Sequence, residues 1–279
     1  ARTRQLLSYA VEPGERVGAW LLLPKGSAPA GGWPAILAIH QHGGEYHLGK
    51  SEPAGMGPNP MYFYGRDLCQ RGFAVLCPDQ LCFEERRPPE DAPNDRAIGM
   101  AYERFEFTRR VVAGSCLQTK YLHDMSCALD VLGALPEVNT AQIGCFGHSL
   151  GGQESLWLAW YDSRIRAAAS SCGFGMISTL IRDRINHNFA LYVPGMLEYG
   201  DVDALVADLA PRPFMFTAGD ADPIFPVDGV RHIAARAAEA YAAAGAPEHF
   251  AAHIFSGVHS LPDDAKQAAY GFLERWIKA

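Results

Sequence analysis

A serine flanked by glycines is the part of this sequence best suited to chemistry. It lies in residues 147–152 (Gly-His-Ser-Leu-Gly-Gly), between the apolar run 142–146 and a helical pattern over 150–160. A serine in a tight turn from strand to helix has its hydroxyl held above the sheet, and small neighbours leave room for the crossing backbone. The N–H groups at the start of the helix can then stabilise a developing oxyanion. We therefore predict that Ser149 is a nucleophile and that the N–H of Leu150 is an oxyanion donor.

A histidine must accept the proton of such a serine, because the hydroxyl is a weak nucleophile at neutral pH. Of the ten histidines, His259 follows the last apolar strand, in the glycine-containing turn 256–260. Ligands of an open α/β sheet bind at the carboxyl ends of its strands. The order serine, acid, histidine that accompanies this kind of turn also requires a late histidine. We predict that His259 is the base.

Two aspartates compete for the role of the acid that orients this histidine. Asp220 and Asp222 both lie in the loop after the apolar run 213–218. Asp220 directly follows a glycine, where an aspartate often stabilises a turn. Asp222 lies four residues beyond the run and so has a longer reach. We expect Asp222 to be the acid, with Asp220 as the alternative.

The elements that would position these residues alternate along the chain. Apolar runs followed by helical patterns are typical of a mostly parallel sheet, here of about eight strands, with helices on both faces. The predicted strands are 17–23, 34–40, 73–77, 142–146, 166–171, 213–218 and 250–255, and the predicted helices are 60–71, 119–134, 150–160, 227–244 and 263–278. Two stretches, 83–117 and 173–210, fit neither pattern. Loops of that length are usually functional, so we expect insertions that wall the active site.

Composition predicts an ordinary globular enzyme. The chain has 279 residues, 48% hydrophobic and 20% charged, without a linker or repeat, so we expect a single domain over 1–279. The net charge of −7 argues against a nucleic-acid partner, and the apolar runs are too short to span a membrane. Seven cysteines without paired spacing favour the reducing cytoplasm, unless a signal peptide has been removed. The oligomeric state stays open.

The motifs together resemble the dienelactone-hydrolase-like and acetyl-xylan-esterase-like branch of the α/β-hydrolase superfamily. The resemblance extends from about Trp20 to Trp276 and rests on residues 147–152, on 210–226 with its Gly-x-x-Asp-x-x-x-Pro motif, and on 257–259. It implies an α/β-hydrolase fold and a catalytic triad of Ser149, Asp222 and His259. The acid-loop motif selects Asp222 independently of its reach.

The resemblance also implies a second oxyanion donor in residues 40–44 (His-Gln-His-Gly-Gly). If the first His-Gln replaces the His-Gly of such enzymes, the donor is the N–H of His42. If the following His-Gly is the true counterpart, the donor is Gly44. The run 49–55 looks like that of a family variant with His-Gln, which favours His42.

The expected reaction is the hydrolysis of a small-molecule carboxylic ester through an acyl-enzyme, without a cofactor. Dienelactone hydrolases often carry a cysteine nucleophile, so the serine here does not favour a dienelactone substrate. Three alternatives are a peptidase of the prolyl-oligopeptidase type, a non-catalytic ligand-binding protein on the same scaffold, and a metal hydrolase. The last would use His40, His42, His47 and Glu45, but no further ligand motif is present to complete a zinc site.

Overall fold

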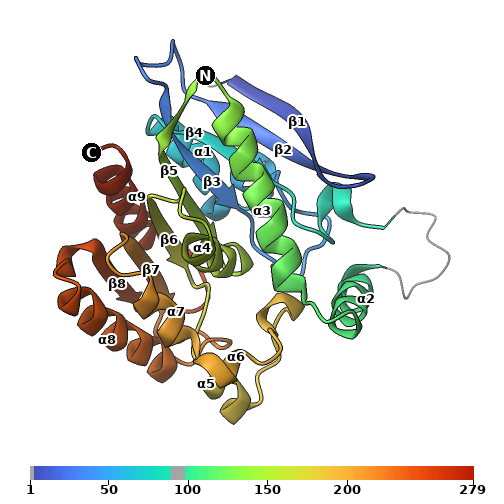
Figure 1. Ribbon diagram of the computed structural model, residues 1–279, viewed down its shortest axis with the longest axis vertical. Coiled ribbons are helices and arrows are strands. Elements are labelled where there is room, and N and C mark those ends of the chain that lie inside the picture. The colour runs from blue at the N-terminus through green and yellow to red at the C-terminus, as the bar shows by residue number, and fades with distance from the viewer. Residues whose placement is uncertain (1–2, 89–97) are drawn as a thin grey trace. The chain divides into compact units, whose positions relative to one another are not determined.

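The computed structural model describes residues 3–88 and 98–279 (Figure 1). The part of the predicted insertion 83–117 that spans 89–97 lies outside the described residues. The chain divides into two compact units, residues 1–139 with 188–194 and residues 140–187 with 195–279. The assignment of 1–279 to a single domain stays a prediction. Among the helices of the described residues, none combines the length and apolar character needed to traverse a bilayer.

The first unit is built around four strands in the order β1-β2-β4-β3. These strands are β1 (Thr3–Glu12), β2 (Glu15–Leu23), β3 (Trp33–Ile39) and β4 (Ala74–Pro78). The first two form an antiparallel hairpin, β2 is antiparallel to β4, and β4 is parallel to β3. Helices α1 (Tyr64–Gln70) and α3 (Leu117–Ala134) pack on these strands. Every residue of β4 is buried, which explains why its run is continuously apolar.

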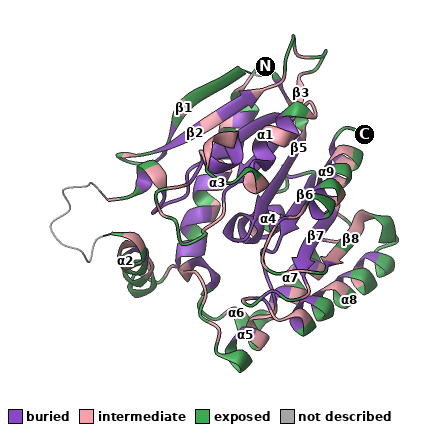
Figure 2. Cartoon of the chain, turned by 180° about the vertical axis from the view of Figure 1, so that it is seen from behind, coloured by how far each residue is buried: buried purple, intermediate pink, exposed green. Residues whose placement is uncertain are grey.

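The second unit contains parallel neighbours in the order β5-β6-β7-β8. They are β5 (Val138–His148), β6 (Ala167–Ser171), β7 (Phe214–Gly219) and β8 (Phe250–Phe255). Helices α4 (Leu150–Tyr161) and α9 (Asp263–Ile277) pack on β6, and α8 (Val227–Ala243) packs on β8. Every residue of β6 and β7 is buried, and these strands are purple in Figure 2, whereas the outer side of α8 is green. The carboxyl ends of parallel strands meet at one edge, so the loops that carry the predicted triad are brought together.

The two stretches that fitted neither pattern contain helices, so their interpretation as loops is wrong in part. Besides the elements above, the described residues contain η1 (Glu52–Met56), η2 (Pro60–Tyr62), η3 (Glu84–Arg86), α2 (Gly99–Val112), α5 (Ile177–Asp183), η5 (Phe189–Leu191), α6 (Met196–Tyr199), α7 (Val202–Asp208) and η6 (Pro247–His249). Helix α2 lacks a clean apolar stripe, because Met100, Phe105 and Val112 are exposed. The other missed helices are too short for a helical period to show.

Strand β1 was also missed, and its position explains why. It lies at an edge and pairs only with β2 among the described strands, and most of its residues are exposed. Only Leu7, Tyr9 and Val11 are buried or half-buried, in its second half, so no continuous buried apolar run marks it. The remaining predicted strands and helices match observed elements within a few residues, and the described residues form eight strands, mostly parallel. The predicted α/β architecture is confirmed.

Candidate active site

Ser149 lies between the end of β5 and the start of α4, in a strained backbone conformation. Its φ of 54° and ψ of −120° are unusual for a residue with a side chain. Such strain persists only where the surroundings fix the backbone. Here the N–H of Ser149 donates to the carbonyl oxygen of Ser171 at 2.8 Å, so the end of β6 holds the turn. The structure thus has the sharp strand-to-helix turn that the motif predicts.

A close backbone approach requires a glycine at position 152, in the first turn of α4. A Cβ atom on Gly152 would lie 2.8 Å from both the Ser170 Oγ and the Ser171 carbonyl oxygen. A Cβ atom on Gly173 would lie 2.4 Å from the Gly152 carbonyl carbon. The first turn of α4 and the end of β6 therefore touch through backbone. This contact fixes the helix N-terminus, and with it the N–H of Leu150, beside Ser149.

The histidine and aspartate predicted to act together form a hydrogen-bonded pair. The Nδ1 atom of His259 lies 2.7 Å from Oδ2 of Asp222. The other oxygen, Oδ1, accepts the N–H groups of Ile224 at 2.9 Å and Phe225 at 3.3 Å. The Asp222 side chain is only 1% exposed. Because this carboxylate can only accept, Nδ1 of His259 carries the proton and Nε2 is left to accept another.

Asp220 has a different set of partners. Its Oδ1 accepts the N–H of Gly257 at 3.0 Å, and its own N–H donates to the carbonyl of Phe255 at 2.9 Å. The neighbouring Gly219 is packed so closely that a Cβ atom there would lie 2.4 Å from the Gly257 oxygen. Asp220 and Gly219 thus hold the loop after β7 against the loop after β8. The geometry places Asp222, and not Asp220, at the histidine.

Two rings that the sequence reasoning did not single out border His259. The buried ring of His148 lies 5.0 Å from that of His259, centroid to centroid, and the ring of Phe225 lies 6.0 Å away. Burial and the nearby His259 hold the pKa of His148 well below its ordinary value, so it adds no charge beside His259. His148 immediately precedes Ser149, so the turn that carries Ser149 lies in contact with His259. Its place inside the Gly-x-Ser motif is the signal that could have marked it.

The loop after β3 contains the second predicted oxyanion donor. The N–H of Gly44 donates to Nδ1 of His42 at 3.0 Å, so Gly44 is engaged within its own loop. The Nε2 of His42 lies 2.9 Å from Glu103, and the hydroxyl of Tyr46 donates to the same carboxylate oxygen at 2.6 Å. Burial alone would raise the pKa of Glu103, but these hydrogen bonds outweigh it and hold the pKa below its ordinary value. The choice between His42 and Gly44 as the second donor stays a prediction.

Two histidines of the metal-hydrolase alternative, His40 and His42, are used in hydrogen bonds instead. His40 is fully buried, with Nδ1 2.8 Å from the Gln41 carbonyl and Nε2 accepting the N–H of Gln80 at 3.0 Å. Burial lowers the pKa of His40 to about 4. Both ring nitrogens of His40 and of His42 therefore have protein partners. Within residues 3–88 and 98–279, the group of side chains placed to hold a metal is Cys172 with Asp222 and His259.

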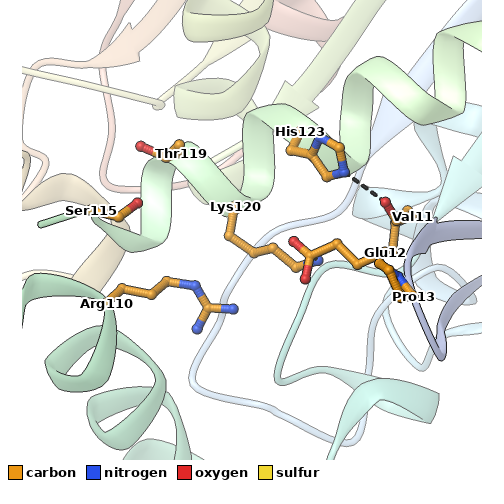
Figure 3. A pocket seen from close by; sticks show the side chains of 8 residues that line it. All are labelled: Val11, Glu12, Pro13, Arg110, Ser115, Thr119, Lys120 and His123. Carbon is orange, nitrogen blue, oxygen red and sulfur yellow. Dashed lines mark hydrogen bonds and ion pairs between the residues drawn. The ribbon is translucent and has the colours of Figure 1, made fainter. Parts of the chain in front are cut away.

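A cavity of about 450 Å³ lies in the first unit and contains none of the predicted site residues (Figure 3). It is lined by Val11, Glu12, Pro13, Arg110, Ser115, Thr119, Lys120 and His123. The Lys120 amine pairs with Glu12 at 3.1 Å and Glu15 at 2.6 Å, and His123 bonds the Val11 carbonyl at 2.7 Å. Its main polar groups already have protein partners, so the cavity offers no catalytic pair.

The parallel strands and the turn that carries Ser149, at the end of β5, are those of an α/β-hydrolase fold. A sequence model of the dienelactone hydrolase family matches residues 26–274. The chain belongs to that family, so the predicted resemblance is confirmed and the enzyme is a carboxylic ester hydrolase.

Individual relatives agree with this assignment. The chain is 28% identical over 268 residues to YtaP of Bacillus subtilis (strain 168), which is provisionally named a hydrolase. The match covers 94% of this chain and 84% of YtaP. A Bacteroides fragilis protein provisionally described as an acetyl xylan esterase superimposes with a TM-score of 0.71 at 16% identity, over 98% of this chain and 74% of the other. A glucuronoyl esterase from Solibacter usitatus gives a TM-score of 0.68 at 17% identity, over 98% and 81%. At these identities the structural matches establish the fold.

Proposed function

We propose that the protein hydrolyses small carboxylic esters through an acyl-enzyme formed on Ser149. The observation that carries the proposal is the 2.7 Å bond between His259 Nδ1 and buried Asp222, with the ring of His259 against that of His148, the residue before Ser149. Nε2 of His259 accepts the serine proton as the hydroxyl attacks the ester carbonyl. Asp222 stabilises the imidazolium that results. Water then attacks the acyl-enzyme. His259 accepts a proton from this water and returns it to the Ser149 oxygen as the acid product leaves.

The developing oxyanion needs N–H donors that are not already bound. The N–H of Leu150 is at the first position of α4, where helix N–H groups have no partner within the helix. For the second donor we propose the N–H of His42, because the N–H of Gly44 is taken up by the His42 ring. Removal of one such donor typically costs roughly 100- to 1000-fold in turnover.

The names of the structural neighbours suggest which esters to try. Glucuronoyl and acetyl xylan esterases act, by name, on esters of sugars. We propose small esters as the substrate class, with acetyl and methyl esters of sugars as the first group to test. The insertions 83–117 and 173–210, within one domain over 1–279, are proposed to set the acyl and alcohol preference.

The test combines an ester panel with covalent labelling. A fluorophosphonate should add to Ser149, and Ser149→Ala should abolish both the adduct and ester turnover. Ser260→Ala is the matched control, because Ser260 is the neighbour of His259 but its hydroxyl bonds the Val258 carbonyl. That variant should keep the adduct. Labelling at another serine in an active preparation would overturn the proposal, and turnover of peptide amides but not esters would favour the peptidase alternative.

A further inference from the structure

A cysteine thiol lies beside the acid and base of the proposed triad. The Sγ of Cys172, an oxygen of Asp222 and a ring nitrogen of His259 all lie within 4.8 Å of one another. The three side chains come from the loops that follow β6, β7 and β8. Nothing in the ester-cleaving mechanism above uses the thiol.

The position of this thiol is fixed by its surroundings. Cys172 has a φ of 44°, a left-handed conformation that glycine would adopt more easily. Its N–H donates to the Thr217 carbonyl at 2.7 Å, and its thiol donates to the Ser260 carbonyl at 3.4 Å. The side chain is held between the acid loop and the base loop, and the residue is 1% exposed.

Sulfur, imidazole nitrogen and carboxylate oxygen are together the donors that Zn²⁺ binds in proteins, whereas Mg²⁺ and Ca²⁺ prefer oxygen. With zinc bonds of about 2.0 to 2.3 Å, tetrahedral ligand atoms lie about 3.3 to 3.7 Å apart. Nδ1 of His259 and Oδ2 of Asp222, now 2.7 Å apart, would separate by about 0.6 Å. The sulfur lies within 4.8 Å of the other two atoms, so it would move inward by at most about 1.5 Å.

We propose that Zn²⁺ inhibits this enzyme by binding Cys172 Sγ, an Asp222 oxygen and Nδ1 of His259, with water as the fourth ligand. The inhibition rests on the proposed function, because it acts through the proposed base. The thiol proton passes to solvent as the sulfur–zinc bond forms. The imidazole proton leaves Nδ1 and an equivalent proton is taken up at Nε2, so the ring keeps its charge and no electron transfer occurs. With Nε2 protonated, His259 cannot accept the proton of Ser149.

The binding test uses the Ser149→Ala variant, so that it does not depend on activity. Titration with Co²⁺, a spectroscopic substitute for Zn²⁺, should give the near-ultraviolet charge-transfer band of a thiolate–cobalt bond, and added Zn²⁺ should remove it. Cys172→Ser in the same background should lose the band. Cys145→Ser is the matched control, since Cys145 is also buried and donates to a backbone carbonyl, that of Ser155. It should keep the band.

The inhibition test compares each variant with its own metal-free activity. Loss of even an outer partner of a metal ligand costs roughly 10- to 100-fold in affinity, so Cys172→Ser should need at least about tenfold more Zn²⁺ for half-inhibition. A chelator should restore wild-type activity. Cys172→Gly, which suits the left-handed backbone, gives the same measurement if the serine variant folds poorly.

The outcomes separate the two proposals. A cobalt complex without the thiolate band, or equal Zn²⁺ sensitivity in wild type and both Cys172 variants, would overturn the metal site and leave the esterase proposal standing. A band that requires Cys172 in a protein without Ser149-dependent ester turnover would support the site and overturn the proposed function.

Discussion

Glu52 should make the folded protein less stable as the pH rises. The residue is 4% exposed, and burial raises the pKa of its carboxyl from 4.5 to about 7 despite two hydrogen bonds from the Gln41 amide, each 3.1 Å long. The unfolded chain therefore releases this proton at lower pH than the folded chain. Below about pH 4.5 both states are protonated, and the carboxyl does not oppose folding.

The magnitude follows from the two pKa values. The difference between about 7 and 4.5 corresponds to about 3 kcal/mol, lost at about 1.4 kcal/mol per pH unit between those values and constant above them. Glu52→Gln keeps the shape and a hydrogen-bonding group but cannot ionise. The free energy of unfolding of this variant, relative to wild type, should therefore increase by about 3 kcal/mol between about pH 4.5 and pH 8.

Urea unfolding of both proteins at about five pH values across this range measures the difference directly. Other titrating groups contribute equally to both proteins and cancel. A difference that stays flat to within about 0.5 kcal/mol would refute the assignment of Glu52 as a buried group with a raised pKa.

Three further predictions concern the loops of the proposed site. Asp222→Asn should leave a folded protein with turnover reduced by about 10⁴-fold, because an amide stabilises the wrong histidine tautomer. Asp220→Asn should instead lower the free energy of unfolding by about 1 kcal/mol. The reverse pattern in ester assays and urea melts would disprove Asp222 as the acid. Gly219→Ala should lower the free energy of unfolding by about 1–3 kcal/mol and should also reduce turnover. Its Cβ would lie 2.4 Å from the Gly257 oxygen, in the loop that carries His259, which is more than 1 Å too close. An unchanged thermal melt would contradict that packing. Glu103→Gln should weaken the buried hydrogen bond to His42 and lower the free energy of unfolding in urea by about 1–2 kcal/mol. An unchanged free energy of unfolding would show that the carboxylate is merely solvated.

The sequence predicts best those features that are local along the chain. The elbow at Ser149 and the buried strands β4 and β7 are visible because a turn motif and a continuous apolar run each lie within a few residues. Strand β1 and helix α2 are not visible, because an exposed edge strand and a helix with exposed apolar residues lack the usual patterns.

Contacts between distant segments are the part that the sequence could not predict. His42 and Glu103 are 61 residues apart, and their bond depends on how α2 returns to the loop after β3. The approach of Cys172 to His259 likewise depends on the order of the strands rather than on spacing in the chain. Asp222 could be chosen over Asp220 from a motif, but the reason that Asp220 is engaged elsewhere appears only when Gly257 is in place.

Because the backbone at Ser149 is strained, selection for stability and selection for catalysis favour different residues at this position. Glycine adopts a φ of 54° without the steric penalty that a serine side chain brings, so Ser149→Gly relieves a strain of order 1–3 kcal/mol. A mutant library screened for heat resistance alone should therefore enrich glycine at position 149. The most thermostable members of such a library would include proteins that have lost their nucleophile.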